Sequence, residues 1–180
     1  MTVKISELKE DDLKLELFAD FNRYQQVKRC WRKEEGQWVL KDIAFTEQWG
    51  EKEYEFLVHC MRKLNAMGGK SYGAFEDGKL VGFFSIGKER FGREMQYVEL
   101  ISLHVSYEKR GCGIGRKLFK TARSVAADFG AKKMYISSHS CEETQAFYKA
   151  MGCVEAEEYR QEAVEKEPCD CQLECETGIG

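Results

Sequence analysis

Apolar residues recur with two different spacings along the chain, and each spacing predicts one kind of element. The apolar run from Met95 to Val105 is rich in β-branched residues and predicts a long, buried central strand. Shorter runs predict further strands, with turns at Glu34-Glu35-Gly36 and Asp77-Gly78. These strands cover residues 25–32, 37–43, 71–75, 80–86 and 133–138, with two closing strands near 154–160 and 169–174.

Apolar residues three and four positions apart predict two helices before the central strand. The first begins after a cap at Asp11 or Asp12, and its apolar face carries Leu13, Leu17, Phe18 and Phe21. The second begins after Thr46 and ends at Gly68-Gly69. Its expected inward residues are Phe56, Leu57, Cys60, Met61 and Leu64.

Two more helices are predicted after the central strand. One begins near Ile114 and is closed by Gly130. The other is short, is opened by a capping box over residues 140–143, and turns Thr144, Phe147, Tyr148 and Met151 inward. Elements in this order predict an α+β fold with a mixed sheet, in a single domain over residues 1–180.

A glycine-rich loop, Gly111-Cys112-Gly113-Ile114-Gly115, lies between the central strand and the helix that follows it. Glycines let the backbone approach an anion closely, and the free N–H groups of the first helical turn point toward it. Arg110, Arg116 and Lys117 add cationic side chains around the same loop. The segment therefore predicts a phosphate-binding site.

Three known types of phosphate-binding loop can be compared with this segment. A P-loop needs G-x-x-x-x-G-K-[ST], and this string is absent from the sequence. A dinucleotide fold needs G-x-G-x-x-G, but Arg116 stands where the third glycine belongs. The loop does match [QR]-x-x-G-x-[GA], as R-G-C-G-I-G over residues 110–115, and F-Y-K-A-M-G-C follows over residues 147–153. With these two segments, the chain resembles the GNAT superfamily of N-acetyltransferases over about residues 70–175.

The resemblance implies a GNAT-type fold, a mostly antiparallel central sheet flanked by helices, and acetyl-CoA as the acyl donor without a metal. It places the donor's diphosphate on the main-chain amides of the glycine loop and its pantetheine arm along the central strand. The residues that it assigns to the donor are Leu103, His104, Val105, Arg110, Gly111, Cys112, Gly113, Ile114, Gly115 and Arg116.

Two side chains are candidates for the catalysis that the resemblance implies. Tyr148 occupies the family's tyrosine position, from which a phenol would protonate the departing thiolate; the alternative is an aromatic residue of the core. Glu99 lies where some members carry a general base; the alternative is a structural carboxylate. His104 is a third, weaker candidate, because it is out of register with Leu103 and Val105.

One position departs from the family pattern. Cys141 stands where many relatives have an asparagine, seven residues before the tyrosine. Ser140 or His139 could replace that contact with the donor. A thiol near a helix start could also be reactive, because its thiolate is favoured there.

The acceptor end is less well defined by the sequence. In GNAT enzymes the first helices and early strands shape the acceptor pocket. Aromatic and acidic side chains in that region suit a small cationic amine, although the same residues could be ordinary core and surface. They are Phe21, Tyr24, Trp31, Trp38, Trp49 and Tyr72, with Asp42, Glu47 and Glu51.

Composition excludes several other classes of function. The formal net charge is −3, with 28 basic and 31 acidic residues, so there is no electrostatic footprint for nucleic acid. No stretch reaches the length of a membrane span, and the N-terminus is not a signal peptide; we expect a cytoplasmic protein. The eight cysteines include C-D-C-Q-L-E-C over residues 169–175, which lacks paired C-x-x-C knuckles. We expect reduced structural thiols rather than a metal site.

The sequence therefore favours direct transfer of an acetyl group from acetyl-CoA to a primary amine of a small molecule. Two alternatives stay open: a CoA-binding sensor without turnover, and a protein-lysine or N-terminal acetyltransferase with an open acidic groove. Exposed strand edges also allow a homodimer.

Overall fold

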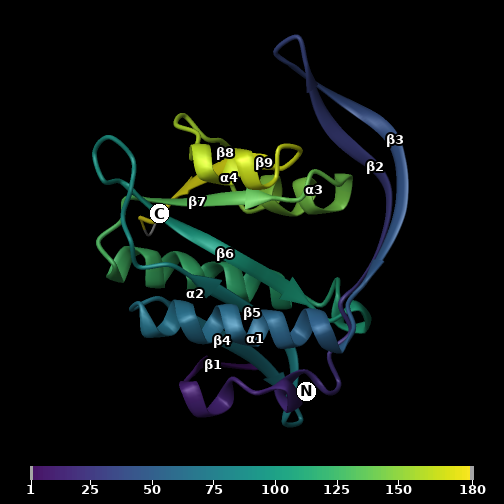
Figure 1. The fold of residues 1–180 in the computed structure, drawn as a ribbon, viewed down its shortest axis with the longest axis vertical. Coiled ribbons are helices and arrows are strands. Elements are labelled where there is room, and N and C mark those ends of the chain that lie inside the picture. Colours follow the sequence, from purple (N-terminus) through teal and green to yellow (C-terminus); the bar gives the residue numbers. More distant parts are fainter. Residues whose placement is uncertain (1, 179–180) are drawn as a thin grey trace.

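The computed structural model describes residues 2–178. Its main sheet has seven strands in the order β1-β4-β5-β6-β7-β9-β8 (Figure 1). Every neighbouring pair is antiparallel except β6 and β7, which are parallel. This confirms the predicted α+β fold with a mixed, mostly antiparallel sheet. The strands are β1 (Lys4–Leu8), β4 (Lys70–Glu76), β5 (Lys79–Ile86), β6 (Tyr97–Val105), β7 (Lys133–Ser138), β8 (Val154–Glu155) and β9 (Cys171–Glu176).

A separate two-stranded sheet consists of β2 (Tyr24–Glu34) and β3 (Gln37–Gln48). It runs along one side of the molecule and projects beyond the main sheet (Figure 1). Both predicted strands are confirmed, and both are longer than predicted. The hairpin is fastened to the body by surface ion pairs: Arg29 contacts Glu142 through two hydrogen bonds, and Lys33 contacts Glu155.

Two long helices cover opposite faces of the main sheet. On one face, α1 (Glu51–Ala66) packs with Leu80 and Phe83 of β5. On the other face, α2 (Ile114–Asp128) packs with Phe84 and Ile86 of the same strand. Close approach of α2 depends on Gly82, because a Cβ there would lie 2.8 Å from Leu118 Cδ1.

The start of α1 differs from the prediction. Thr46 does not cap the helix; it lies in β3, paired with Gln26. The helix begins after Gly50, whose N–H donates to the Glu53 carboxylate at 2.7 Å. Phe56, predicted to point inward, is 69% exposed, and the deeply buried residues of α1 are Tyr54 and Met61.

The first predicted helix is wrong. In its place are two short 3₁₀ helices, η1 (Glu10–Asp12) and η2 (Leu15–Phe18). Between them Leu13 is fully buried, and its carbonyl accepts a hydrogen bond from Arg62 Nε of α1 at 2.8 Å. The Leu13 carbonyl therefore bonds to a side chain of α1 and not to a main-chain amide one helical turn later. The segment does not form one continuous α-helix for this reason.

The C-terminal part contains α3 (Glu142–Ala150) and α4 (Gln161–Lys166). The short predicted helix is confirmed as α3, but its N-cap is Cys141 rather than Ser140. The strand predicted near residues 154–160 is only the two residues of β8, and α4 was not predicted. The last predicted strand is confirmed as β9, two residues later, with Cys171 and Cys175 buried.

Two further observations concern residues 2–178 as a whole. None of their helices is both long enough and apolar enough to cross a bilayer. In the same residues, no group of three or more His, Cys, Asp or Glu side chains is placed to hold a metal ion.

Candidate active site

The site begins where β6 and β7 separate. The two strands pair only over Tyr97–Glu99 and then diverge toward their C-terminal ends (Figure 1). At that point β6 also shifts register against β5, with Ile101 as the extra residue. A bulge bends a strand, so this residue turns the rest of β6 away from β7. The edge of β6 beyond Glu99 is therefore left without pairing to β7.

The divergence opens a cleft of about 710 Å³, which is within the usual range for a small-molecule site. Its walls come from β6, β7, the loop before α2 and the inner side of α3. The basic lining side chains are Arg23, Lys109, Arg110 and Arg116, and the single lining carboxylate within residues 2–178 is that of Glu143. The cleft therefore favours an anionic ligand.

The glycine loop forms one end of the cleft. After the 3₁₀ helix η3 (Tyr107–Lys109), Gly111 and Gly113 have φ angles of +77° and +79°, in the left-handed region. Gly113 is the N-cap of α2, so the helix begins with Ile114 and directs its first free N–H groups into the loop. This backbone is what the sequence predicted for a phosphate cradle.

The predicted donor-binding residues lie together. Of the ten, all except Cys112 line the cleft. Cys112 is exposed, and its Sγ points back to the Arg110 carbonyl at 3.7 Å. Arg110 itself bonds to the Val105 and Tyr24 carbonyls, at 3.3 and 2.7 Å. It thereby holds the loop against the end of β6.

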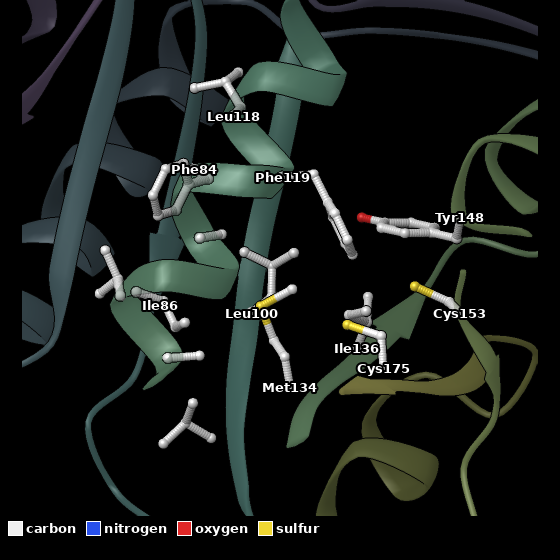
Figure 2. Packing of buried hydrophobic residues seen from close by; sticks show 14 of the residues in the cluster. Phe84, Ile86, Leu100, Leu118, Phe119, Met134, Ile136, Tyr148, Cys153 and Cys175 are labelled. Atoms are coloured by element: carbon white, nitrogen blue, oxygen red, sulfur yellow. The ribbon is translucent and has the colours of Figure 1, made fainter. Parts of the chain in front are cut away.

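Tyr148 of α3 lines the cleft and is 6% exposed. Its ring packs against Phe119 and Phe147, and its hydroxyl is directed toward Phe119 and away from α3 (Figure 2). Burial, followed by the neighbouring Cys153 and Cys175 thiols, raises the pKa of Tyr148 well above its usual value. The phenol therefore carries its proton at neutral pH, as an ordinary tyrosine does.

Glu99 is placed differently. It lies where β6 and β7 are still paired and is not part of the cleft lining. Its carboxylate contacts Arg160 Nη1 at 2.6 Å, with both side chains mostly covered. Burial raises the pKa of Glu99 although Arg160 opposes the change. The geometry favours the structural alternative, and a role as general base stays a prediction.

His104 lines the cleft from β6, but its imidazole is already engaged. Arg23 Nε donates a hydrogen bond to His104 Nδ1 at 3.2 Å, and the ring packs against Trp49 and Phe83. Burial, then the charges of Arg23 and Arg110, lower the pKa of His104 to about 3. The ring is neutral, and its lone pair on Nδ1 is occupied.

Cys141 lies behind the cleft wall and is fully buried. Gln25 Nε2 donates to its Sγ at 2.8 Å, and Thr144 Oγ1 lies 3.0 Å away. Burial alone would raise the pKa of this thiol, but contacts with His139 and Thr144 outweigh burial and lower it. His139 lines the cleft, whereas Ser140 does not and instead accepts a hydrogen bond from Arg32.

The aromatic and acidic side chains expected at the acceptor end are not in the cleft wall. Phe21 belongs to the core beneath α1, and Tyr72 stacks on Phe84. Arg23 and Gln25, at the start of the hairpin, line the cleft instead. Sequence reasoning missed them because nothing in their spacing shows that the hairpin crosses the cleft.

The sequence model of the acetyltransferase (GNAT) family matches residues 11–153. The chain belongs to the GNAT acetyltransferase family. As a member it is an acyltransferase of the acetyl-CoA-dependent kind. The match begins well before residue 70, where the sequence resemblance began, and ends before residue 175.

Solved structures support the same fold. A nourseothricin acetyltransferase has a TM-score of 0.70 at 14% identity, covering 99% of this chain and 100% of that one. A protein from Bacillus anthracis str. Ames assigned as a streptothricin acetyltransferase, in complex with acetyl coenzyme A, has a TM-score of 0.70 at 15% identity, over 97% and 95%. The PaiA N-acetyltransferase from Thermoplasma acidophilum, in complex with coenzyme A, has a TM-score of 0.60 at 16% identity, covering 98% of this chain and 99% of that one. A comparison with curated proteins gave no significant match.

Proposed function

We propose that this GNAT enzyme transfers the acetyl group of acetyl-CoA directly to a primary amine of a small-molecule acceptor. The observation that carries the proposal is the cleft between β6 and β7, which combines an unpaired strand edge, an amide-lined loop and the Tyr148 phenol. Each of the three parts suits one portion of a thioester donor.

The donor would be held mainly by the backbone. Amides of the loop over residues 110–115 would receive the diphosphate, assisted by the positive end of α2. The pantetheine amides would pair with the free edge of β6 at Leu103–Val105, as an added strand. Two solved relatives in complex with acetyl coenzyme A and coenzyme A support this placement by their shared fold.

The transfer itself would need a nucleophile and an acid. The acceptor nitrogen attacks the thioester carbonyl carbon, the carbon–sulfur bond breaks so that CoA leaves as its thiolate, and the amine releases its proton to solvent in the cleft. Tyr148 would donate its proton to the departing thiolate, because its phenol lines the cleft and carries its proton at neutral pH. His104 is a poor base because its Nδ1 already accepts from Arg23.

The test is thiol release from acetyl-CoA in the presence of a panel of amines: polyamines, amino acids, aminoglycosides and lysine peptides. We expect release that depends on a small amine, and an acetylated product detected by mass spectrometry. Tight acetyl-CoA binding without any release would favour the sensor alternative. Release with peptides alone would favour a protein acetyltransferase, although the basic cleft lining does not resemble an acidic peptide groove.

A further inference from the structure

Arg23 is the one side chain in residues 2–178 that has a buried nitrogen or oxygen atom without a hydrogen-bond partner. It immediately precedes β2, lines the cleft, and is 6% exposed. Its backbone is fixed by neighbours: its N–H donates to the Tyr54 hydroxyl, and its carbonyl accepts from the Trp49 N–H. The guanidinium lies 5.3 Å from the centre of the Trp49 ring. The group is therefore held in one place before any ligand arrives.

The donors of this guanidinium are only partly used. Nε donates to His104 Nδ1 at 3.2 Å, and Nη2 donates to Glu47 Oε2 at 3.3 Å. Nη1 is the one buried side-chain nitrogen or oxygen within residues 2–178 that has no partner. A buried cationic donor without an acceptor is unfavourable, so the site is incomplete as it stands.

The ion pair between Arg23 and Glu47 is weak. Charge-assisted bonds to carboxylates are usually 2.7–2.9 Å long, and the 3.3 Å contact with Glu47 exceeds that range. The Glu47 side chain is 37% exposed, whereas that of Arg23 is 8% exposed. Glu47 can therefore swing toward solvent and free Nη2, which then joins Nη1 as an unpaired donor, while Arg23 cannot follow it.

We propose that Arg23 binds a carboxylate of the acceptor, so that the preferred substrates are small primary amines that also carry a carboxylate. This inference rests on the proposed function and names its substrate class. The two Nη atoms of an arginine match the two oxygens of a carboxylate, a fit that a lysine ammonium cannot reproduce. The nearby guanidinium of Arg110 adds to the positive potential, whereas His104 is neutral and adds none. Arg23 is thus a specificity-determining residue rather than an acid or a base.

The test compares acceptors matched in everything except the carboxylate: amino acids, their carboxamides and the corresponding decarboxylated amines. We expect kcat/KM for the carboxylate acceptor to exceed that for the carboxamide by at least tenfold in the wild-type enzyme. Arg23→Gln should abolish this preference through KM, while activity toward the carboxamide is retained. Arg23→Lys should restore little of it. Arg90→Gln, an exposed arginine away from the cleft, is the matched control and should leave the preference unchanged.

Glu47→Gln should change KM for the carboxylate substrate in the opposite direction to Arg23→Gln. A misfolded variant would not bind the substrate more tightly. Without its competing carboxylate, Arg23 should bind the acceptor more tightly and lower KM for the carboxylate substrate several-fold. A wild-type enzyme that prefers the carboxamide or the decarboxylated amine, or an Arg23→Gln variant that keeps the original preference, would overturn the inference.

A binding measurement separates this inference from the proposed function. Titration of the CoA-loaded protein with the amino acid, followed by calorimetry, needs no turnover. We expect binding that weakens at least tenfold in Arg23→Gln, with CoA affinity unchanged. If no amine is acetylated but this binding is seen, the proposed function fails and the carboxylate site stands. If amines are acetylated but the wild-type protein and Arg23→Gln bind the amino acid equally tightly, only the carboxylate site fails.

Discussion

Arg23 Nε lies 3.2 Å from His104 Nδ1, and this contact determines what the histidine can do. A guanidinium is always a donor, so Nδ1 must accept, and the proton of the neutral ring is fixed on Nε2. A neighbouring positive charge also opposes protonation of the ring. The His104 imidazole is therefore a structural acceptor.

The first prediction concerns stability against pH. The pKa of His104 is about 3 in the folded protein and has an ordinary value near 6.5 when unfolded. Because the unfolded state binds the extra proton, stability falls as pH drops through 6.5 toward 3. From pH 7 to pH 5 the loss attributable to this group is about 2 kcal/mol. Denaturant unfolding at several pH values measures it.

Two variants make that measurement specific. His104→Asn keeps an acceptor for Arg23 Nε but cannot titrate, so its stability should fall less over the same interval. His59→Asn removes an exposed histidine and should leave the wild-type pH dependence unchanged. Equal pH dependence in all three proteins would contradict a neutral, half-buried His104.

The second prediction tests the acid. Tyr148→Phe removes only a hydroxyl that makes no hydrogen bond to another side chain or carbonyl in residues 2–178, so the fold should be retained. Loss of proton donation should lower kcat roughly 10²- to 10³-fold. The KM for acetyl-CoA should change little, because the backbone holds the donor. Steady-state kinetics with a saturating amine measures both.

A buried tyrosine away from the cleft supplies the control. Tyr135 donates its hydroxyl to Gln172 and accepts from the Arg160 N–H. Tyr135→Phe should cost about 1 kcal/mol of stability from the lost hydrogen bonds and leave kcat unchanged. If Tyr148→Phe behaves like Tyr135→Phe, then Tyr148 is an aromatic residue of the core.

The glycine-loop end of the cleft could be predicted from sequence because its determinants are local. A strand, a glycine loop and a helix follow one another in the chain, so residues that lie close in sequence also lie close in space. Gly111 and Gly113 adopt the left-handed backbone that only glycine tolerates well, and the motif records that requirement directly. Nine of the ten predicted donor residues line the cleft for this reason.

The hairpin side of the cleft could not be predicted because its determinants are long-range. Arg23 meets His104 only because the hairpin of β2 and β3 crosses the cleft, and no sequence period encodes that crossing. Glu99 shows the same limit. Its position in an apolar strand is visible in the sequence, but its partner, Arg160, comes from the segment just before α4, a helix that was not predicted.

The third prediction concerns Glu99. Because its carboxylate is paired with Arg160 outside the cleft, Glu99→Gln should lower kcat less than threefold. It should reduce the free energy of unfolding by about 1–2 kcal/mol, since a partly buried guanidinium loses its counter-ion. Steady-state kinetics and denaturant unfolding of Glu99→Gln decide whether Glu99 is a structural carboxylate or a general base. A hundredfold loss of kcat at unchanged stability would restore Glu99 as the general base.

The fourth prediction separates backbone conformation from sterics in the glycine loop. A Cβ at Gly113 would meet no atom within 4 Å, so Gly113→Ala acts only through its φ of +79°. Strain of about 1 kcal/mol should shift the loop toward other conformations and weaken CoA binding about fivefold or more, as measured by calorimetry. Gly36→Ala, at the hairpin turn, has φ of +80° and an equally open Cβ position. It should cost similar stability without any change in CoA affinity. Equal CoA affinity in both variants would mean that the loop amides do not bind the donor, because the two substitutions differ only in which turn they strain.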